Sequence, residues 1–202
     1  MIVITGSKSF IGKKLIYNLE KKNKRIFKID INEKNSMNSK KINFKNKNIS
    51  KYFKRKSTIV HLAAISNDSD GRKNPRLTFD VNVNGTINLL EASRKQGIKH
   101  FIFASTEWVY DKNEKKINSE NDDIIFSKMN SEYSISKMVC EQILKNYARF
   151  FKITILRFGI IYSNRIGIGS AIESLVHKVI NEEKIQVGSL RTSRNFIHID
   201  DI

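Results

Sequence analysis

Directly after Met1 the chain reads Ile2-Val3-Ile4-Thr5-Gly6-Ser7-Lys8-Ser9-Phe10-Ile11-Gly12, and this stretch decides its fold. Ile2 to Thr5 predict a buried strand, and the glycine-bearing loop after them leads into a segment with helical periodicity. In such an arrangement of strand, loop and helix, backbone N–H groups and the helix dipole can hold a pyrophosphate. The pattern expects glycine at Ser9, where a Cβ can crowd the ligand or shift the loop. The alternative interpretation is a glycine-bearing turn that binds nothing.

Beyond this stretch, short β-branched and apolar runs alternate with longer amphipathic segments, which is typical of βαβ units around a parallel sheet. The expected strands are Ile2 to Thr5, Arg25 to Ile29, Thr58 to Leu62, His100 to Ala104 and Ile153 to Leu156, with short ones near Lys41 to Phe44 and Lys184 to Val187. The expected helices are Phe10 to Lys22, Arg76 to Lys95, Glu132 to Arg149 and Gly169 to Asn181. We predict an α/β fold, a Rossmann-type doubly wound parallel sheet with the beginning of a small C-terminal substrate lobe.

The composition is that of a globular protein of a reducing compartment. The 202 residues are 40% hydrophobic, which is enough for a real core. The single cysteine, Cys140, excludes an internal disulfide and a multi-cysteine metal site. We assign no metal, because the four histidines show no ligand spacing. Neither a signal peptide nor a bilayer-spanning apolar run is evident, so we expect a cytoplasmic protein without a membrane partner.

The chain is strongly basic, with a formal net charge of +17 and a pI near 9.9. Such a balance would ordinarily suggest a nucleic-acid partner. Here the lysines are scattered, are densest from Lys21 to Lys56 among asparagines and isoleucines, and are not interleaved with aromatic residues. We therefore attribute the charge to a compositional bias of the source genome and expect no nucleic-acid partner.

A carboxylate at Asp30 closes the second expected strand, about 20 residues beyond the glycine loop. At that place it can accept both ribose hydroxyls of an adenosine. This favours NAD as the cofactor, because a 2′-phosphate would meet a like charge. Lys28 and Lys34 lie near enough in sequence to weaken the argument, and the alternative for Asp30 is a turn aspartate before Asn32.

Tyr133 and Lys137 stand four residues apart on an expected helix. Residues at this spacing share one helix face, so the ammonium can stabilise a phenolate and lower the phenol pKa from its usual value near 10. The same spacing joins Tyr17 to Lys21 and Tyr52 to Lys56, so it is weak evidence alone. For Tyr17 and Tyr52 we expect packing roles. What distinguishes Tyr133 is the order of the motifs around it.

In that order, the motifs resemble the extended short-chain dehydrogenase/reductase family, specifically its nucleotide-sugar epimerases and dehydratases. The resemblance runs almost end to end. Its further segments are Val60-His61-Leu62-Ala63-Ala64, Asn82-Val83-Asn84-Gly85-Thr86, Phe103-Ala104-Ser105-Thr106, Leu156-Arg157-Phe158 and Arg194 to Asp201. It implies that Tyr133, Lys137 and Thr106 are catalytic. It implies an NAD site that contains Gly6, Ser7, Ser9, Phe10, Ile11, Gly12, Asp30, Leu62, Ala63, Ala64, Asn82, Tyr133, Lys137 and Phe158.

The resemblance implies an NAD-dependent epimerase that acts on a nucleotide-sugar through a transient 4-keto intermediate. Tyr133 would take the hydroxyl proton, Lys137 would lower its pKa, Thr106 would orient the hydroxyl, and NAD would take the hydride. Trp108 replaces a carboxylate that the 4,6-dehydratases use, which disfavours dehydration. The stretch from Thr106 to Asp111 is similar to that of the 4-keto-sugar reductases. An NAD(P)H-dependent reductase, or a non-catalytic dinucleotide-binding module, is therefore the alternative.

The resemblance implies that the chain has two regions. We expect an NAD-binding domain over residues 1–164 and a partial, truncated substrate-binding region over residues 165–202. Family members continue well past the motif that ends at Asp201, so we expect a fragment of a longer protein or a shortened chain. Such a chain should bind NAD weakly and turn over no sugar nucleotide. A homodimer is left open.

Overall fold

A computed structural model describes residues 1–44, 49–110, 118–124, 126, 129, 131–165, 169–182, 184–187 and 194–202 of the chain. Asp111 lies outside these residues. The chain divides into two compact units, Met1–Arg157 and Phe158–Ile202. The roles that we expect for residues 1–164 and 165–202 stay predictions.

The larger unit is built on a six-stranded sheet with the strand order β3-β2-β1-β4-β5-β6. The strands are β1 (Ile2–Thr5), β2 (Ile26–Asp30), β3 (Ser39–Lys41), β4 (Thr58–His61), β5 (His100–Thr106) and β6 (Lys152–Phe158). The pairs β2–β3, β1–β2, β1–β4 and β4–β5 are parallel. The order reverses between β1 and β4, and ligands of such sheets bind at the carboxyl ends of the strands beside this reversal. The predicted Rossmann-type α/β fold is confirmed.

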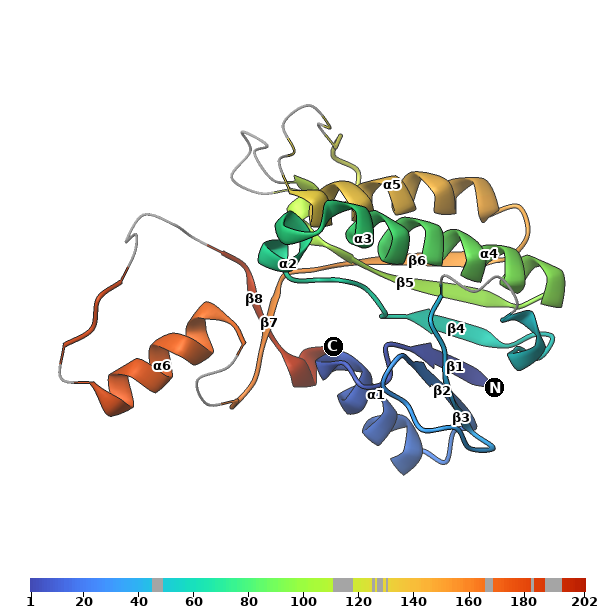
Figure 1. Cartoon of the computed structure of the whole chain (residues 1–202), viewed down its shortest axis with the longest axis horizontal. Helices are drawn as coiled ribbons and strands as arrows, with labels where there is room; N and C mark the ends of the chain where they lie inside the picture. The colour runs from blue at the N-terminus through green and yellow to red at the C-terminus, as the bar shows by residue number, and fades with distance from the viewer. Residues whose placement is uncertain are drawn as a thin grey trace. The chain divides into compact units, whose positions relative to one another are not determined.

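Helices cover both faces of this sheet, with α1 (Phe10–Lys21) on one side and α4 (Gly85–Gln96) and α5 (Glu132–Tyr147) on the other (Figure 1). Neighbouring strand residues point to opposite faces, so Val3 joins the cluster with Leu89 and Phe101, whereas Ile4 joins Ile16 of α1. Both faces of the central strands are therefore dry, as their continuous apolar sequences require.

The expected helix from Arg76 to Lys95 is present in three pieces. Pro75 starts α3 (Pro75–Phe79), a π-helical turn follows over Asp80–Asn84, and α4 completes the run. A short helix before them, α2 (Asp68–Lys73), was not expected. Single-turn π-helices are frequent at functional sites, and this one carries Asn82. The larger unit also contains the 3₁₀ turns Ser50–Tyr52 and Glu107–Tyr110.

The other two tyrosine and lysine pairs, Tyr17 with Lys21 and Tyr52 with Lys56, lie away from the predicted site. Tyr17 is 53% exposed on α1, with the Lys21 ammonium 4.3 Å from the centre of its ring. The ring of Tyr52 stacks on Phe27 of β2 at a centroid distance of 6.0 Å. Neither tyrosine ends a strand or lines the carboxyl edge of the sheet.

The smaller unit contains β7 (Ile160–Tyr162) paired in parallel with β8 (Phe196–His198), the helix α6 (Ala171–Asn181) and a 3₁₀ turn (Ile199–Asp201). Ser170 and Glu173 form a capping box at the start of α6. The strand expected near Lys184 to Val187 is wrong, because alternating apolar residues form a strand only where a partner strand is available. No helix among the described residues is long and apolar enough to cross a membrane.

Candidate active site

Tyr133 and Lys137 lie in the first two turns of α5. Ser131 caps this helix by accepting a hydrogen bond from the Ser134 backbone N–H, and its hydroxyl donates to the carboxylate of Asp68. The cap fixes where α5 begins, and the four-residue spacing then brings both side chains to one helix face.

Lys137 is a buried cation directed at the end of β5. Its ammonium donates to the carbonyl oxygen of Ala104 at 2.7 Å and lies 4.7 Å from the centre of the Phe103 ring. Burial lowers the pKa of Lys137 to about 8, although Cys140 and Glu141 act in the opposite direction. The side chain is therefore still mostly protonated near neutral pH.

Tyr133 lies close to the other two expected catalytic residues. Its phenol interacts with the side chain of Thr106, the last residue of β5, closely enough for Thr106 to lower the phenol pKa, and the centre of its ring lies 5.9 Å from the Lys137 ammonium. The Thr106 hydroxyl oxygen also accepts from the Trp108 backbone N–H at 3.2 Å, and the Trp108 ring packs edge-on against Tyr133. Burial raises the pKa of Tyr133 above its usual value, and the interaction with Thr106 offsets part of that rise. Burial dominates, so the lowered pKa that we expect for Tyr133 is not found in this structure.

Asn82 ties the loop after β4 to α5. Its side-chain oxygen accepts from the Ile65 N–H at 2.8 Å, and its two amide hydrogens go to the Ile65 carbonyl at 3.0 Å and the Ser136 hydroxyl at 2.9 Å. The Ser136 hydroxyl in turn donates to the Tyr133 carbonyl at 2.7 Å. Both amide hydrogens of Asn82 are thus used by the protein. The cofactor contact expected of Asn82 stays a prediction. Among the side-chain atoms of Asn82, only the amide oxygen, which can accept a second hydrogen bond, is able to make that contact.

A hydrogen-bonded chain runs from β1 through His61 to the same π-helical turn. The Thr86 hydroxyl donates to the Asn82 carbonyl at 2.5 Å, so it must accept from Nε2–H of His61 at 3.0 Å. The other nitrogen, Nδ1, then accepts from the Thr5 hydroxyl at 2.6 Å, and Thr5 accepts from the Ala63 N–H at 3.3 Å. Burial, and then the charge of Lys137, lower the pKa of His61 to about 3, so it stays neutral and this direction is fixed.

A buried ion pair behind the site was not anticipated from the sequence. Glu141, fully buried one turn after Lys137, accepts from Nε of Arg157 at 3.1 Å and from its terminal nitrogen at 2.7 Å. Glu141 also accepts from the Ser105 hydroxyl at 2.5 Å, and Arg157 donates to the Tyr110 hydroxyl. Through Ser105 this pair holds the end of β5, which carries Thr106, against α5. The sequence feature that could have revealed this ion pair is the position of Glu141, four residues after Lys137 on a helix face that is otherwise buried.

The loop between β1 and α1 fits a dinucleotide phosphate site. Gly6 has φ +70°, and a Cβ there would lie 2.7 Å from the backbone nitrogen of Ala63. A Cβ on Gly12 would lie 2.2 Å from the Gly6 carbonyl oxygen. Both glycines are therefore required by the close backbone approach.

Ser9 does not need to be glycine for the loop to close. Its backbone is extended, with φ −66° and ψ 166°, and its hydroxyl accepts from the Gly12 N–H at 3.1 Å as the N-cap of α1. The local backbone thus tolerates the departure from the pattern. The crowding of the cofactor that we expect from the Ser9 Cβ stays a prediction.

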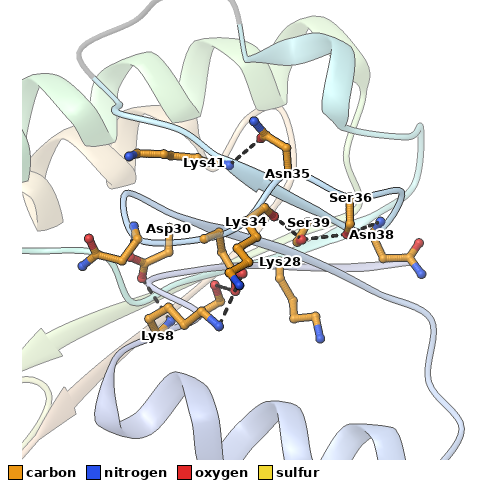
Figure 2. A network of polar contacts seen from close by, with 12 residues as sticks. Lys8, Lys28, Asp30, Lys34, Asn35, Ser36, Asn38, Ser39 and Lys41 are labelled. Atoms are coloured by element: carbon orange, nitrogen blue, oxygen red, sulfur yellow. Dashed lines mark hydrogen bonds and ion pairs between the residues drawn. The ribbon is translucent and has the colours of Figure 1, made fainter.

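At the end of β2, the Asp30 carboxylate faces this loop. It accepts from the Lys8 backbone N–H at 3.0 Å and from the Asn32 N–H at 2.9 Å (Figure 2). A carboxylate oxygen has capacity for more than one hydrogen bond, so Asp30 can still accept ribose hydroxyls. The glycine loop and this carboxylate together fit the adenosine diphosphate part of NAD.

The remaining expected cofactor residues take these places. Ser7 lies in the loop, Phe10 and Ile11 begin α1, Leu62, Ala63 and Ala64 follow β4, and Phe158 ends β6. Their contacts with NAD stay predictions. Among the described residues, no group of three or more histidine, cysteine, aspartate or glutamate side chains could hold a metal ion.

Comparison with known proteins decides the family. The model of the NAD dependent epimerase/dehydratase family matches residues 2–202. The chain belongs to this family. The extended short-chain dehydrogenase/reductase resemblance seen in the motif order is thereby confirmed, and the members of the epimerase/dehydratase family are NAD-dependent enzymes.

Two curated relatives match almost the whole chain at more than 30% identity. A Methanocaldococcus jannaschii protein assigned to the UDP-glucose 4-epimerases is 31% identical over all of this chain and 70% of its own length. The GDP-6-deoxy-D-talose 4-dehydrogenase of Aggregatibacter actinomycetemcomitans is 32% identical over 99% of this chain and 66% of its own length. A third relative is matched over 53% of its length. The chain thus spans roughly half to 70% of the length of these three relatives.

A solved structure in the epimerase/dehydratase family has the same fold. The UDP-N-acetylglucosamine 4-epimerase from Methanobrevibacter ruminantium M1, in complex with UDP-N-acetylmuramic acid, superposes with a TM-score of 0.86. It is 22% identical, and the match covers 99% of this chain and 69% of that one. At this identity the likeness supports the arrangement of the sheet and helices.

Proposed function

We propose that this chain carries the NAD site and the catalytic residues of a cytoplasmic nucleotide-sugar 4-epimerase, which works through a transient 4-keto sugar. The observation that carries the proposal is the meeting of Tyr133 with Thr106, beside the buried ammonium of Lys137, at the carboxyl edge of a parallel sheet. Family membership supports the NAD dependence, and the epimerase assigned among the relatives supports the reaction class.

The residues proposed to hold NAD are those of the glycine loop, Asp30, and the segment after β4. Gly6 and Gly12 allow the backbone to come close to the pyrophosphate, and Asp30 accepts the ribose hydroxyls. NAD supplies a reversible hydride acceptor next to the sugar carbon.

Tyr133 is proposed to take the proton from the sugar hydroxyl and to return it. Its buried phenol holds a proton tightly, since burial raises its pKa. It therefore needs a nearby positive charge to become a base, and the Lys137 ammonium, helped by an oxidised nicotinamide, provides one. The Thr106 side chain lies beside the phenol and influences its pKa, so its hydroxyl is suited to orient the same sugar oxygen.

A 4-keto-sugar reductase is the second candidate. It would use the same three side chains and would release its cofactor in every turnover. One observation favours it, namely that a relative 32% identical to this chain is named a 4-dehydrogenase. Cofactor that stays bound through purification supports the epimerase, whereas stoichiometric consumption of NAD(P)H with a keto-sugar supports the reductase.

The proposal is tested by calorimetric titration of the purified chain with NAD. We expect weak but saturable binding, which Asp30→Asn reduces and Tyr133→Phe leaves within about tenfold, since a lost hydrogen bond of ordinary strength accounts for no more than this. Tyr17→Phe, which removes a hydroxyl from the exposed face of α1, is the matched control. Absence of saturable NAD binding by the wild-type chain refutes the proposal.

A further inference from the structure

Glu33 is a buried carboxylate for which the proposed chemistry has no use. Its side chain is only 7% exposed. The Ser7 hydroxyl donates to its Oε1 at 2.7 Å, and the Lys8 ammonium lies 3.5 Å from its Oε2. Glutamate is seldom buried unless it is paired. Both partners of Glu33 come from the glycine loop, so this carboxylate belongs to the surroundings of the cofactor site.

Glu33 determines which charges remain available beside Asp30. Lys8 is bound to Asp30 through its backbone N–H, and its ammonium is paired with Glu33 instead (Figure 2). Lys28 precedes Asp30 on β2, but its ammonium pairs with Glu20 of α1 at 3.2 Å, and Figure 2 shows its side chain directed away from Asp30. The ammonium groups of Lys8 and Lys28 are thus engaged by carboxylates other than Asp30.

We propose that Glu33 determines the preference of this site for NAD over NADP, because it pairs with the one ammonium of the glycine loop. NADP differs from NAD by a 2′-phosphate, a dianion that requires a cation close to the ribose. In the wild-type chain the pairing with Glu33 withholds the Lys8 ammonium from that phosphate. Once the Glu33 charge is removed, the Lys8 ammonium is free to pair with the phosphate. This inference rests on the proposed function, since it takes Asp30 to be the ribose ligand.

The test compares the Kd values of NAD and NADP by calorimetry for the full chain and four variants. Glu33→Gln keeps an oxygen that can accept from Ser7 but removes the charge, and Glu33→Gln with Lys8→Gln also removes the ammonium. Lys8→Gln alone tests the cation in its paired state. Glu91→Gln is the matched control, because it removes the same charge from an exposed pair with Arg94 on α4.

We expect Glu33→Gln to raise the affinity for NADP relative to NAD on the order of tenfold, as one freed charge-assisted pair would do. The double variant should return to the wild-type ratio. Lys8→Gln alone and Glu91→Gln should each stay within about twofold of it.

Two results overturn the inference while leaving the proposed function intact. One is NAD binding with an unchanged ratio in Glu33→Gln. The other is a loss of NADP affinity in Lys8→Gln alone, because such a loss would mean that Glu33 does not withhold the ammonium. This second result can be measured even if Glu33→Gln fails to fold. If the wild-type chain binds neither nucleotide, the proposed function fails, and this inference fails with it.

Discussion

Replacing Arg157 with methionine should destabilise the larger unit strongly. The substitution leaves the carboxylate of Glu141 fully buried, with the Ser105 hydroxyl as its remaining side-chain donor among the contacts described above. Removing one partner of a buried pair costs about 3–5 kcal/mol, because the other charge stays without compensation. Since the Arg157 side chain is 16% exposed and water can partly reach the gap, we expect about 3 kcal/mol. That is a large share of a typical unfolding free energy of about 5–15 kcal/mol.

Urea denaturation followed by circular dichroism measures this loss. A decrease of about 3 kcal/mol corresponds to a melting temperature lower by roughly 6–12 °C for a domain of this size. Arg94→Met is the matched control, since Arg94 pairs with Glu91 at 2.8 Å, close to the 2.7 Å of the buried pair, but on the surface, where the two side chains are 40% and 39% exposed. Exposed pairs contribute about 0–1 kcal/mol.

A double variant separates the buried charge from simple loss of packing. Combining Arg157→Met with Glu141→Leu removes both charges, and replacing a buried pair with apolar residues is often close to neutral. We therefore expect the double variant to recover most of the loss. The reasoning is refuted if Arg157→Met lies within about 1 kcal/mol of Arg94→Met, or if the double variant is less stable than Arg157→Met.

Three further predictions concern the site itself. Thr106→Val should raise the pKa of Tyr133, because the interaction with Thr106 lowers it. The pKa is measured from the phenolate absorbance of the chain minus that of Tyr133→Phe, and an unchanged pKa would speak against the interaction. The folded-state pKa of His61, about 3, is below its unfolded value of about 6.5, so the unfolded chain binds more protons between these two pH values. The free energy of unfolding therefore decreases as the pH is lowered, by about 2 kcal/mol from pH 7 to pH 5. Urea denaturation at both pH values checks this, and His61→Gln should flatten the dependence. Ser9→Ala should cost about 1 kcal/mol as the α1 cap is lost, whereas Ser9→Gly should cost only a few tenths, and equal losses would contradict the capping role.

Much of the fold could be predicted because its signals are local. The strand, glycine loop and helix at the start of the chain, and the apolar runs after them, each fix a short element by periodicity and turn chemistry. Parallel strands bring their carboxyl ends to one edge, which is why Thr106 and the glycine loop could be expected at the same edge of the sheet.

The spacing of tyrosine and lysine shows where local signals end. Lys21 does reach the ring of Tyr17, at 4.3 Å, and hydrogen bonding with Lys21 lowers the pKa of that exposed phenol. Tyr133 differs because Thr106 of β5 and the Trp108 ring lie against it, and burial dominates its pKa. Enclosure depends on the packing of distant segments, which spacing within one helix does not encode.

The polar network behind the site could not be predicted for a similar reason. Glu33, Glu141 and Arg157 are charged residues, which a sequence pattern assigns to the surface. They are buried because partners from other elements, among them Ser7 and Ser105, satisfy them. The π-helical turn at Asn82 was missed because its hydrogen-bonding partners, Ile65 and Ser136, lie in other segments.

The central claim is that Tyr133 becomes a base when NAD is bound beside it. The most direct measurement is the titration of the Tyr133 phenol by ultraviolet difference absorbance between the chain and Tyr133→Phe, with and without saturating NAD. The account predicts that NAD lowers the pKa of Tyr133, and that Lys137→Met leaves the pKa higher in the NAD complex than it is in the wild-type chain. A Tyr133 pKa that does not change when NAD is bound would contradict it.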